Sequence, residues 1–450
     1  MSARFHPLDR DTPYLLPPSL QDWLPEGHLA RFVVEMVDAL DLSELEGGYE
    51  GRGKTAYHPA MLVALLFYGY ATGVFSSRKL EQATYDSVAM RYITADTHPD
   101  HDTIAHFRKR FLGPLERLFV QILAMAQAMG MLRVGTVSLD GTKVKANASK
   151  HKAMSWGYAN RLEAQLREEV HTLMERAAHA DVQEVAGLDI PEELERRESR
   201  LAAIERAKAE LERRAKERYE AEQAEYEEKV ARRRAKEAET GKKARGREPK
   251  APEPGPRAKD QVNFTDEESR IMASSEGFVQ GYNAQAAVDC DSHLIVAEHV
   301  SQSANDKQEM APALERLDAV RDVIGKPRAL LADAGYHSEA NVRGCEVAGI
   351  EPSIASGRQR HNTPLAQRLE PPVPPPPQRH GVAAMAHRMS TPEGKALYAK
   401  RKSTVETVFG VIKEVMGFRR FHLRGVEAVR GEWTLVCMAW NLKRMHGGVA

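Results

Sequence analysis

Two apolar stretches of the chain end on an aspartate followed by a small residue. "VGTVSLDG" reaches Asp140, and "RALLADAG" reaches Asp333. Apolar, β-branched runs of this length predict buried strands. Because an unpaired buried carboxylate costs several kcal/mol, each aspartate should be paired, exposed at its strand end or bound to a cation. If both strands end at the same sheet edge, the two anions must share a proton or hold a cation.

A third carboxylate lies in a basic helical segment, "YAKRKSTVETVFGVIK", which contains Glu406. From residue 395 to residue 424 there are eight basic and two acidic residues. The candidate phosphate-binding side chains around it are Tyr398, Arg401, Lys402 and Lys413. Neither aspartate stretch offers cysteine, so oxygen ligands and hard divalent cations fit best. The alternative is that Glu406 merely pairs with Lys402 or Lys413 on the helix surface.

The elements that must position these acids predict an α/β domain with a mixed sheet. A first strand ends on Asp140, and a β-hairpin follows much later, formed by "GFVQGYNAQAAVDC" and "SHLIVAEHVSQSA". After it we expect a helix ending at Gly325, the strand ending on Asp333, a short helix, the strand "IEPSIAS" and a long helix begun by a Thr-Pro pair. Trp433 and Trp440 have the spacing of a helix face packed on the core.

A long polar insertion separates the first strand from the hairpin. Residues 158–238 are rich in Glu, Arg, Lys and Ala, and the heptad spacing of Leu194, Leu201, Ile204 and Leu211 predicts a helical hairpin or coiled coil. "DVQEVAGLDIP" is its expected bend. Residues 241–259 carry seven basic and two acidic residues with several prolines, which predicts a mobile linker. A solvated helix pair without chemistry is the simplest interpretation of the insertion.

Residues 25–132 show helical periodicity and little strand signal. A short helix, "HDTIAHFRKRF", ends on Arg108, Lys109 and Arg110. Short helices with tight turns and a basic final helix suit a helix-turn-helix-like DNA-binding domain. The alternative is a plain helical bundle, since cations are favourable at any helix C-terminus.

Bulk composition excludes several classes of protein. The 450 residues predict two or three folded units, and 42% hydrophobic content excludes wholesale disorder. Lys+Arg and Asp+Glu are both 64, so any nucleic-acid footprint must be local. Three scattered cysteines favour a reducing cytosol. The longest apolar run, Met61 to Phe75, is short for a membrane span. We therefore expect a soluble, cytoplasmic protein.

With these motifs in place, the sequence resembles bacterial insertion-sequence transposases of the DDE class. "DGTKVKANAS", "LLADAGYHS", "GYNAQAAVD", "ANDK" and "TPEGKALYAKRKSTVE" carry the resemblance over nearly the whole chain. It implies an RNase H-like catalytic core, with Asp140, Asp333 and Glu406 as catalytic residues and ligands of two Mg²⁺ or Mn²⁺ ions. It also implies double-stranded DNA partners, namely the terminal inverted repeats and the target, a homodimer, and a nucleoid-associated bacterial protein.

The resemblance divides the chain into a helical DNA-binding domain (1–132), the first part of the catalytic core (133–157), the coiled-coil insertion with its basic linker (158–260) and the rest of the core (261–450). The family pattern places an arginine four residues before the glutamate. Here Arg401 lies five before Glu406 and Lys402 occupies the expected place, which leaves open which of them contacts phosphate. Lys143, just after Asp140, is a further candidate phosphate contact or a solvated lysine.

Two other functions compete with a transposase. A metal-dependent endonuclease that cuts without strand transfer would use the same three acids. A non-catalytic DNA-binding or scaffold protein has no need of strand-end carboxylates, so the intact acidic set argues against it.

Overall fold

The computed structural model describes residues 19–49, 56–110, 112–179, 190–241, 243, 246–274, 277–357 and 376–449. A mixed sheet forms its centre, in the order β4-β5-β1-β7-β8. β6 also pairs with β5, along the part of β5 that follows its pairing with β4. The strands are β1 (Thr136–Lys145), β4 (Arg270–Ser274), β5 (Gly277–Asp289), β6 (Ile295–Ser301), β7 (Ala329–Ala332) and β8 (Glu351–Ile354). The predicted α/β domain with a mixed sheet is confirmed.

Strand direction decides which residues share an edge of this sheet. β1, β7 and β8 run parallel, whereas β5 runs antiparallel to β1, β4 and β6. The predicted hairpin is therefore the β5–β6 pair. β7 is buried along its whole length, and β5 and β6 nearly so, as expected for strands covered on both faces.

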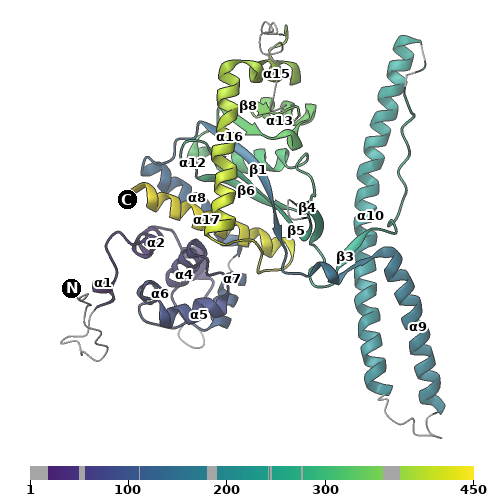
Figure 1. Cartoon of the computed structure of the whole chain (residues 1–450), viewed down its shortest axis with the longest axis horizontal. Coiled ribbons are helices and arrows are strands. Elements are labelled where there is room, and N and C mark those ends of the chain that lie inside the picture. The colour runs from purple at the N-terminus through teal and green to yellow at the C-terminus, as the bar shows by residue number, and fades with distance from the viewer. Residues whose placement is uncertain are drawn as a thin grey trace, which may run out of the picture.

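The helices after the hairpin cover the sheet (Figure 1). They are α11 (Met310–Ala319), α12 (Arg321–Ile324), α13 (Glu339–Val347), α15 (Val382–Ser390), α16 (Pro392–Gly410), continued by a π-helical turn (Val411–Val415), and α17 (Val426–Val449). Thr391 caps α16 by accepting from the Gly394 amide at 3.1 Å, with Pro392 in the first turn. Trp433 and Trp440 are buried on α17, which confirms their core role.

The N-terminal region is entirely helical. Its helices are α1 (Leu20–Trp23), α2 (Leu29–Asp38), α3 (Ser43–Gly47), α4 (Pro59–Thr72), α5 (Ser77–Asp86), α6 (Val88–Ile93), α7 (His101–Arg110) and α8 (Leu112–Ala128). Helix α4 is buried on nearly all sides and ends at Gly73, whose φ of +85° favours glycine. Ser87 separates α5 from α6 and caps α6 by accepting a hydrogen bond from the Met90 amide.

One hydrophobic core joins the N-terminal helices to the sheet. Helix α17 packs against α4 and α8 on one side and β6 on the other. Buried residues of both regions therefore belong to a single cluster, from Val33 on α2 to Ala332 on β7. The two regions are one packed body.

The insertion after β1 is a separate arm. Its helices are α9 (Trp156–His179) and α10 (Ile190–Thr240). β2 (Ala153–Ser155), which precedes α9, pairs at the base of the arm with β3 (Gln261–Asn263), which follows α10. The 51 residues of α10 span about 75 Å, so α10 continues past the hairpin base in Figure 1. Ile204 and Leu211 are buried in two small clusters that are distinct from the main core. The predicted bend lies almost wholly outside the described residues.

The linker expected to be mobile instead runs back along α10 wherever it is described. Arg257 contacts Glu222 at 3.1 Å, and Arg218 donates to the Gly255 carbonyl at 3.0 Å. Arg233 donates to the Arg247 carbonyl at 3.2 Å. Mobility of the linker stays a prediction, but its described part has partners because α10 continues past the base of the arm.

Within the described residues, no single helix combines the length and the apolar composition of a membrane span. Helices α4 and α5 reach that composition only as a pair, and they meet at a bend of 95°.

Replacing residues 161–238 by a short flexible linker should leave the body folded. The arm has its own small apolar clusters, so its removal takes little from the main core. Trp433 should stay buried in the folded variant. Tryptophan fluorescence should then show a single cooperative unfolding transition in urea. Loss of cooperative unfolding would show that the body depends on the arm.

Candidate active site

The register of β1 and β7 brings two carboxylates together. Ser138 lies beside Leu331 in this parallel pair, so extending the register by two residues sets Asp140 beside Asp333. Asp333 directly follows β7 and caps the next turn by accepting from the Gly335 amide at 2.8 Å. The two aspartates therefore lie in one region of the sheet, as expected. The prediction that the first strand ends on Asp140 was wrong, because β1 continues to Lys145 and pairs with β5 from Asp140 to Lys145. The polar residues after Asp140 find their partners on a strand distant in sequence, which a local pattern cannot show.

Helix α16 adds Glu406 and a cation to the pair. Arg401 Nη2 lies 2.8 Å from Asp140 Oδ2 and 4.0 Å from Asp333 Oδ2. Its Nη1 lies 2.8 Å from Glu406 Oε1. One guanidinium thus bridges carboxylates from two strands and a helix. Glu406 thus pairs with Arg401, a partner that the surface-pairing alternative did not include.

The electrostatics of the cluster show a deficit of positive charge. Burial raises the pKa of Asp140 to about 6, and the charges of Asp333 and Asp306 add to that rise. Arg401 and the Gly141 amide lower it in part. Burial opposes the charge of Arg401, but its attraction to Asp140 and neighbouring acids leaves the Arg401 pKa raised. The site therefore favours additional positive charge.

A fourth carboxylate, Asp306, lies beside the cluster and was missed by the sequence analysis. Its Oδ1 accepts from Asn283 Nδ2 at 2.7 Å, Gln285 Nε2 at 2.8 Å and Lys143 Nζ at 3.1 Å. The available signal was the alternation of Asn283 and Gln285 along β5, which places two polar side chains on one face of an otherwise apolar strand.

Gly141 permits this close packing. A Cβ atom there would collide with Gln285 Nε2 and lie 2.7 Å from Asp306 Oδ1. Beneath the aspartates, the buried Tyr336 hydroxyl donates to Gln285 Oε1. Asn283, Gln285, Asp306 and Tyr336 are therefore joined by hydrogen bonds next to Gly141, the residue that follows Asp140.

The predicted phosphate-binding residues are placed differently from one another. Arg401 faces the carboxylates, while Lys402 is exposed on α16. Tyr398 lies close enough for the cluster to act on it: burial raises its pKa, Arg401 lowers it, and Asp333 and Asp140 raise it again. Lys413 is half-buried in the π-helical turn. Lys143 is paired with Asp306, so it is not the solvated lysine of the alternative.

Arg108 is a correction to the predicted DNA-binding set. It is only 6% exposed, and its Nη1 donates to the Tyr70 hydroxyl at 3.0 Å and the Phe75 carbonyl at 2.9 Å. Tyr70 in turn donates to the buried Glu432 on α17 at 2.9 Å. Arg108 therefore joins the N-terminal helices to α17 and cannot reach DNA. A one-letter pattern cannot show that this face of α7 points inward.

Lys109 and Arg110 are exposed at the end of α7. Arg110 donates to the Gly48 carbonyl, and its guanidinium lies 5.5 Å from the centre of the Tyr49 ring. Of the three predicted DNA contacts on this helix, these two remain accessible.

The acidic residues suit divalent cations in type, but they do not form a closed metal site. Among the described residues, no group of three His, Cys, Asp or Glu side chains has the arrangement of a metal site, and the guanidinium of Arg401 lies between the acids. An all-oxygen donor set is the one that Mg²⁺ and Mn²⁺ prefer. The buried Arg401 Nε has no hydrogen-bond partner, so this ion pairing leaves the cluster incompletely satisfied.

Comparisons with known proteins give consistent matches. A family described as "Transposase DDE domain" matches residues 246–442, and one described as "Transposase domain (DUF772)" matches residues 18–110. The first match contains Asp333 and Glu406 but begins after Asp140.

A curated protein from Burkholderia cepacia, named as a transposase for insertion sequence element IS402, is 29% identical over 91 residues. The alignment covers 19% of this chain and 43% of that relative. The chain thus spans less than half the length of the curated relative it matches. No solved structure matches significantly.

Replacing Arg401 by Met should destabilise the protein by about 3 kcal/mol in the presence of a chelator, because three carboxylates lose their buried counter-charge. Adding Asp140→Asn to this variant should restore part of the loss. Lys402→Met, one residue along the same helix and exposed, should change stability by less than about 0.5 kcal/mol. Urea unfolding measures all three, and equal effects from Arg401 and Lys402 would contradict the bridging role.

Arg108→Met should cost about 2 kcal/mol of stability, because the Tyr70 hydroxyl and the Phe75 carbonyl lose a buried donor. The neighbouring Lys109→Met is the matched control and should be nearly neutral. Thermal unfolding distinguishes the two. If Arg108→Met left stability unchanged but weakened DNA binding, Arg108 would be a DNA contact after all.

Proposed function

Because the chain belongs to the insertion-sequence transposases of the DDE class, we propose that it cuts and joins DNA at the ends of an insertion sequence. The observation that carries this proposal is the convergence of Asp140, Asp333 and Glu406 on one guanidinium. Three acids from separate elements meet at a point that requires positive charge, beside a strongly basic helix.

We assign the catalytic core an RNase H-like fold. The parallel strands β1, β7 and β8, with the antiparallel β5 and then β6 on the other side of β1, support this assignment. The position of the helical arm between β1 and β5 fits an insertion after the first core strand.

Asp140, Asp333 and Glu406 would hold two Mg²⁺ or Mn²⁺ ions. Bound there, the ions would make the attacking hydroxyl more acidic and stabilise the leaving oxygen. The raised pKa of Asp140 supports this assignment, since burial has left its charge only partly offset. Asp306 orients Lys143 and Gln285 around the acids, and so acts on the site through other residues.

The reaction is a pair of phosphoryl transfers. In the first, a water oxygen bonds to phosphorus while the bond to the 3′ oxygen breaks, which frees a 3′-hydroxyl and leaves a 5′-phosphate. In the second, that hydroxyl bonds to a target phosphorus while the target's own 3′ oxygen leaves. Each departing proton passes to solvent, and no atom changes oxidation state.

The basic residues of α16 would bind the phosphates. A phosphate could replace the carboxylates that contact Arg401, because a planar guanidinium binds both kinds of anion. Lys402 is exposed on the same helix and Tyr398 lies next to the cluster. Lys413 and Lys143 extend the positive charge along the site. We therefore favour Arg401 over Lys402 as the contact nearest the reacting phosphate.

The partners are duplex DNA and a second copy of the chain. Lys109 and Arg110 at the exposed end of α7 are the proposed contacts of the N-terminal helices with the terminal inverted repeat. Cutting two ends of one element requires two active sites, which favours a homodimer.

Asp140→Asn, Asp333→Asn and Glu406→Gln should each abolish Mg²⁺-dependent cleavage of end-containing DNA and leave DNA binding largely intact. The amides keep the side-chain shape but lose the charge that attracts a cation. Asp322→Asn and Glu393→Gln, both exposed and outside the cluster, are matched controls that should cleave normally.

Cleavage and strand transfer are measured on the same labelled DNA, so the assay also separates a transposase from a simple endonuclease. Near-normal cleavage by any one of the three variants would remove that residue from the ligand set. If the wild type cut the DNA but formed no joined product, the proposed function would be that of a nuclease and not of a transposase.

A further inference from the structure

The far part of α10 has a charge balance unlike the rest of the arm. From Lys229 to Lys250 there are ten basic and three acidic residues. From Glu192 to Glu222, on the hairpin side, there are nine basic and ten acidic residues. We use "distal arm" for the described residues Lys229–Thr240 of α10 together with Gly246–Lys250, which run back beside it.

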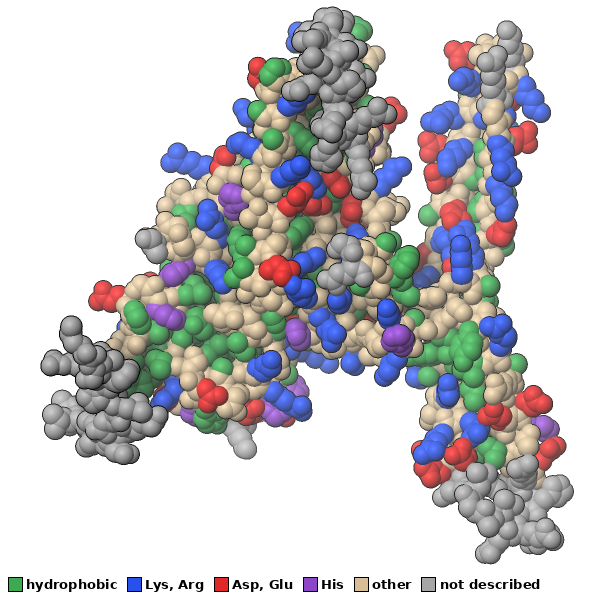
Figure 2. All heavy atoms as spheres, in the orientation of Figure 1, with side chains coloured by type: hydrophobic (Ala, Val, Ile, Leu, Met, Phe, Trp, Pro, Cys, Tyr) green, Lys and Arg blue, Asp and Glu red, His purple; other side chains and the backbone are tan. Residues whose placement is uncertain are grey.

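Acidic residues offset the charge of the hairpin side as a whole, whereas the distal arm has few of them. On the hairpin side, Arg197 contacts Glu169 and Lys208 contacts Glu163, each at 2.7 Å. Four cations of the distal arm are exposed and form no ion pair within the described part of the chain: Arg232, Arg234, Lys236 and Arg247. Figure 2 shows basic side chains, with acidic ones among them, along this upper part of the arm, which stands clear of the body.

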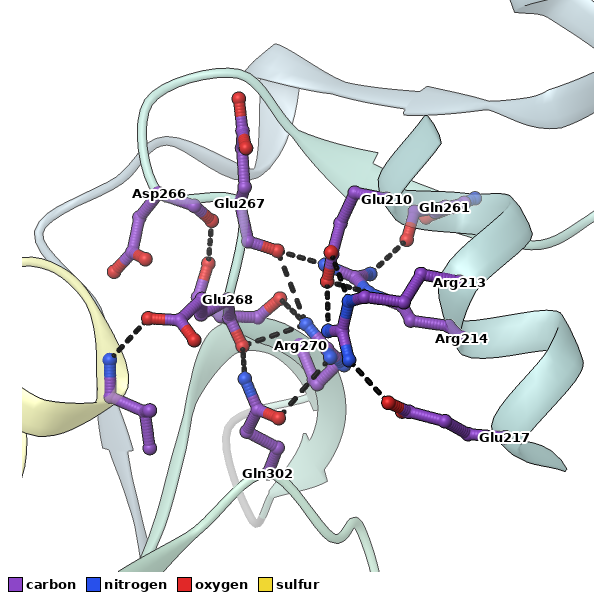
Figure 3. A network of polar contacts seen from close by, with 12 residues as sticks. Glu210, Arg213, Arg214, Glu217, Gln261, Asp266, Glu267, Glu268, Arg270 and Gln302 are labelled. Carbon is purple, nitrogen blue, oxygen red and sulfur yellow. Dashed lines mark hydrogen bonds and ion pairs between the residues drawn. The ribbon is translucent and has the colours of Figure 1, made fainter. Parts of the chain in front are cut away.

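A partly exposed arginine network connects the arm to the catalytic sheet (Figure 3). On α10, Glu210 accepts from Arg213 and Arg214 at 2.7 Å each. Arg214 continues to the carbonyls of Gln261 and Glu267. Arg270 on β4 donates to the Glu268 carbonyl at 2.7 Å and to Gln302 Oε1 at 3.3 Å.

This network is tight enough to set a direction for α10. Burial lowers the pKa of Arg270 to about 10, with the charge of Arg214 adding to that effect. Burial opposes the charge of Glu210, but hydrogen bonds from Arg213 and Arg214 hold its pKa at about 2. Arg218 adds a contact to Asp260 at 2.7 Å. Since β4 belongs to the same sheet as Asp140, the arm projects from the catalytic body at a fixed angle.

The distal arm extends well past the attachment of the arm to the sheet. From Arg218, which contacts Asp260 at the base, to the end of α10 at Thr240 the helix rises about 33 Å.

We propose that the distal arm binds the phosphate backbone of duplex DNA outside the segment held at the catalytic acids. This inference rests on the proposed function. Unpaired, exposed cations on a rigid helix suit a regularly spaced polyanion and carry no base-specific groups in a defined arrangement. The contact would lengthen the bound segment and fix its path, without adding sequence preference.

A matched pair of variants tests the proposal. The distal variant combines Arg232→Gln, Arg234→Gln, Lys236→Gln and Arg247→Gln. The control variant combines Arg161→Gln, Arg200→Gln, Arg206→Gln and Lys216→Gln, which are equally exposed cations of the hairpin side. Both lose four positive charges, so a general effect of net charge would appear in both.

Binding is measured by fluorescence anisotropy over a salt series, without divalent metal. One duplex extends well beyond the site, and the other is too short to reach the distal arm. On the long duplex, the distal variant should reduce the slope of log K against log salt by about 3 to 4 units, at about 0.9 for each lost contact. On the short duplex, and for the control variant on both, the slope should stay at the wild-type value.

Equal slopes for the two variants on the long duplex would overturn the proposal. A changed oligomeric state of the distal variant by sedimentation, with an unchanged slope, would also overturn it and make the surface a protein contact. The readout needs no cleavage, so failure of the catalytic assignment would leave it intact. Normal cleavage with no difference in slope would reject the DNA contact of the distal arm and leave the proposed function standing.

Discussion

The arrangement of this protein depends on one partly buried ion cluster, in which the Arg401 guanidinium meets Asp140, Asp333 and Glu406. These groups come from two neighbouring parallel strands and a helix far along the chain. Several anions this close are stable only if positive charge lies between them. The same requirement that holds α16 on the sheet would also create the affinity for divalent ions and phosphate. Stability without ligand and the proposed function with ligand would therefore depend on the same charges.

The N-terminal helices are held to this core by a second buried polar group. Glu432 on α17 accepts from the Tyr70 hydroxyl and from the amides of His422 and Leu423. Arg108 adds its charge through Tyr70. With α17 packed between the N-terminal helices and the sheet, relative motion of the two regions would break both apolar and polar contacts. DNA held by the N-terminal helices would thus keep a set position relative to the acids.

The arm follows a different principle. Its apolar clusters are small and separate from the main core, so it adds little to the stability of the body. Its attachment is nevertheless specific, because Arg214, Arg218 and Arg270 form directional hydrogen bonds to backbone and carboxylate groups at its base. Fixed donors set an orientation more exactly than apolar contacts do. The arm therefore combines independent folding with a defined position.

The sequence by itself determined the chemistry of the candidate site and the order of its elements. Apolar runs ending on Asp140 and Asp333 can be recognised locally, and so can the amphipathic arm and the buried tryptophans of α17. Only the tertiary structure decided which charges face inward. It buried Arg108, selected Arg401 over Lys402, added Asp306 and laid the basic linker along α10. Local patterns report the type and spacing of residues, but a long charged side chain finds its partner through packing between elements distant in sequence, and that information is absent from any single segment.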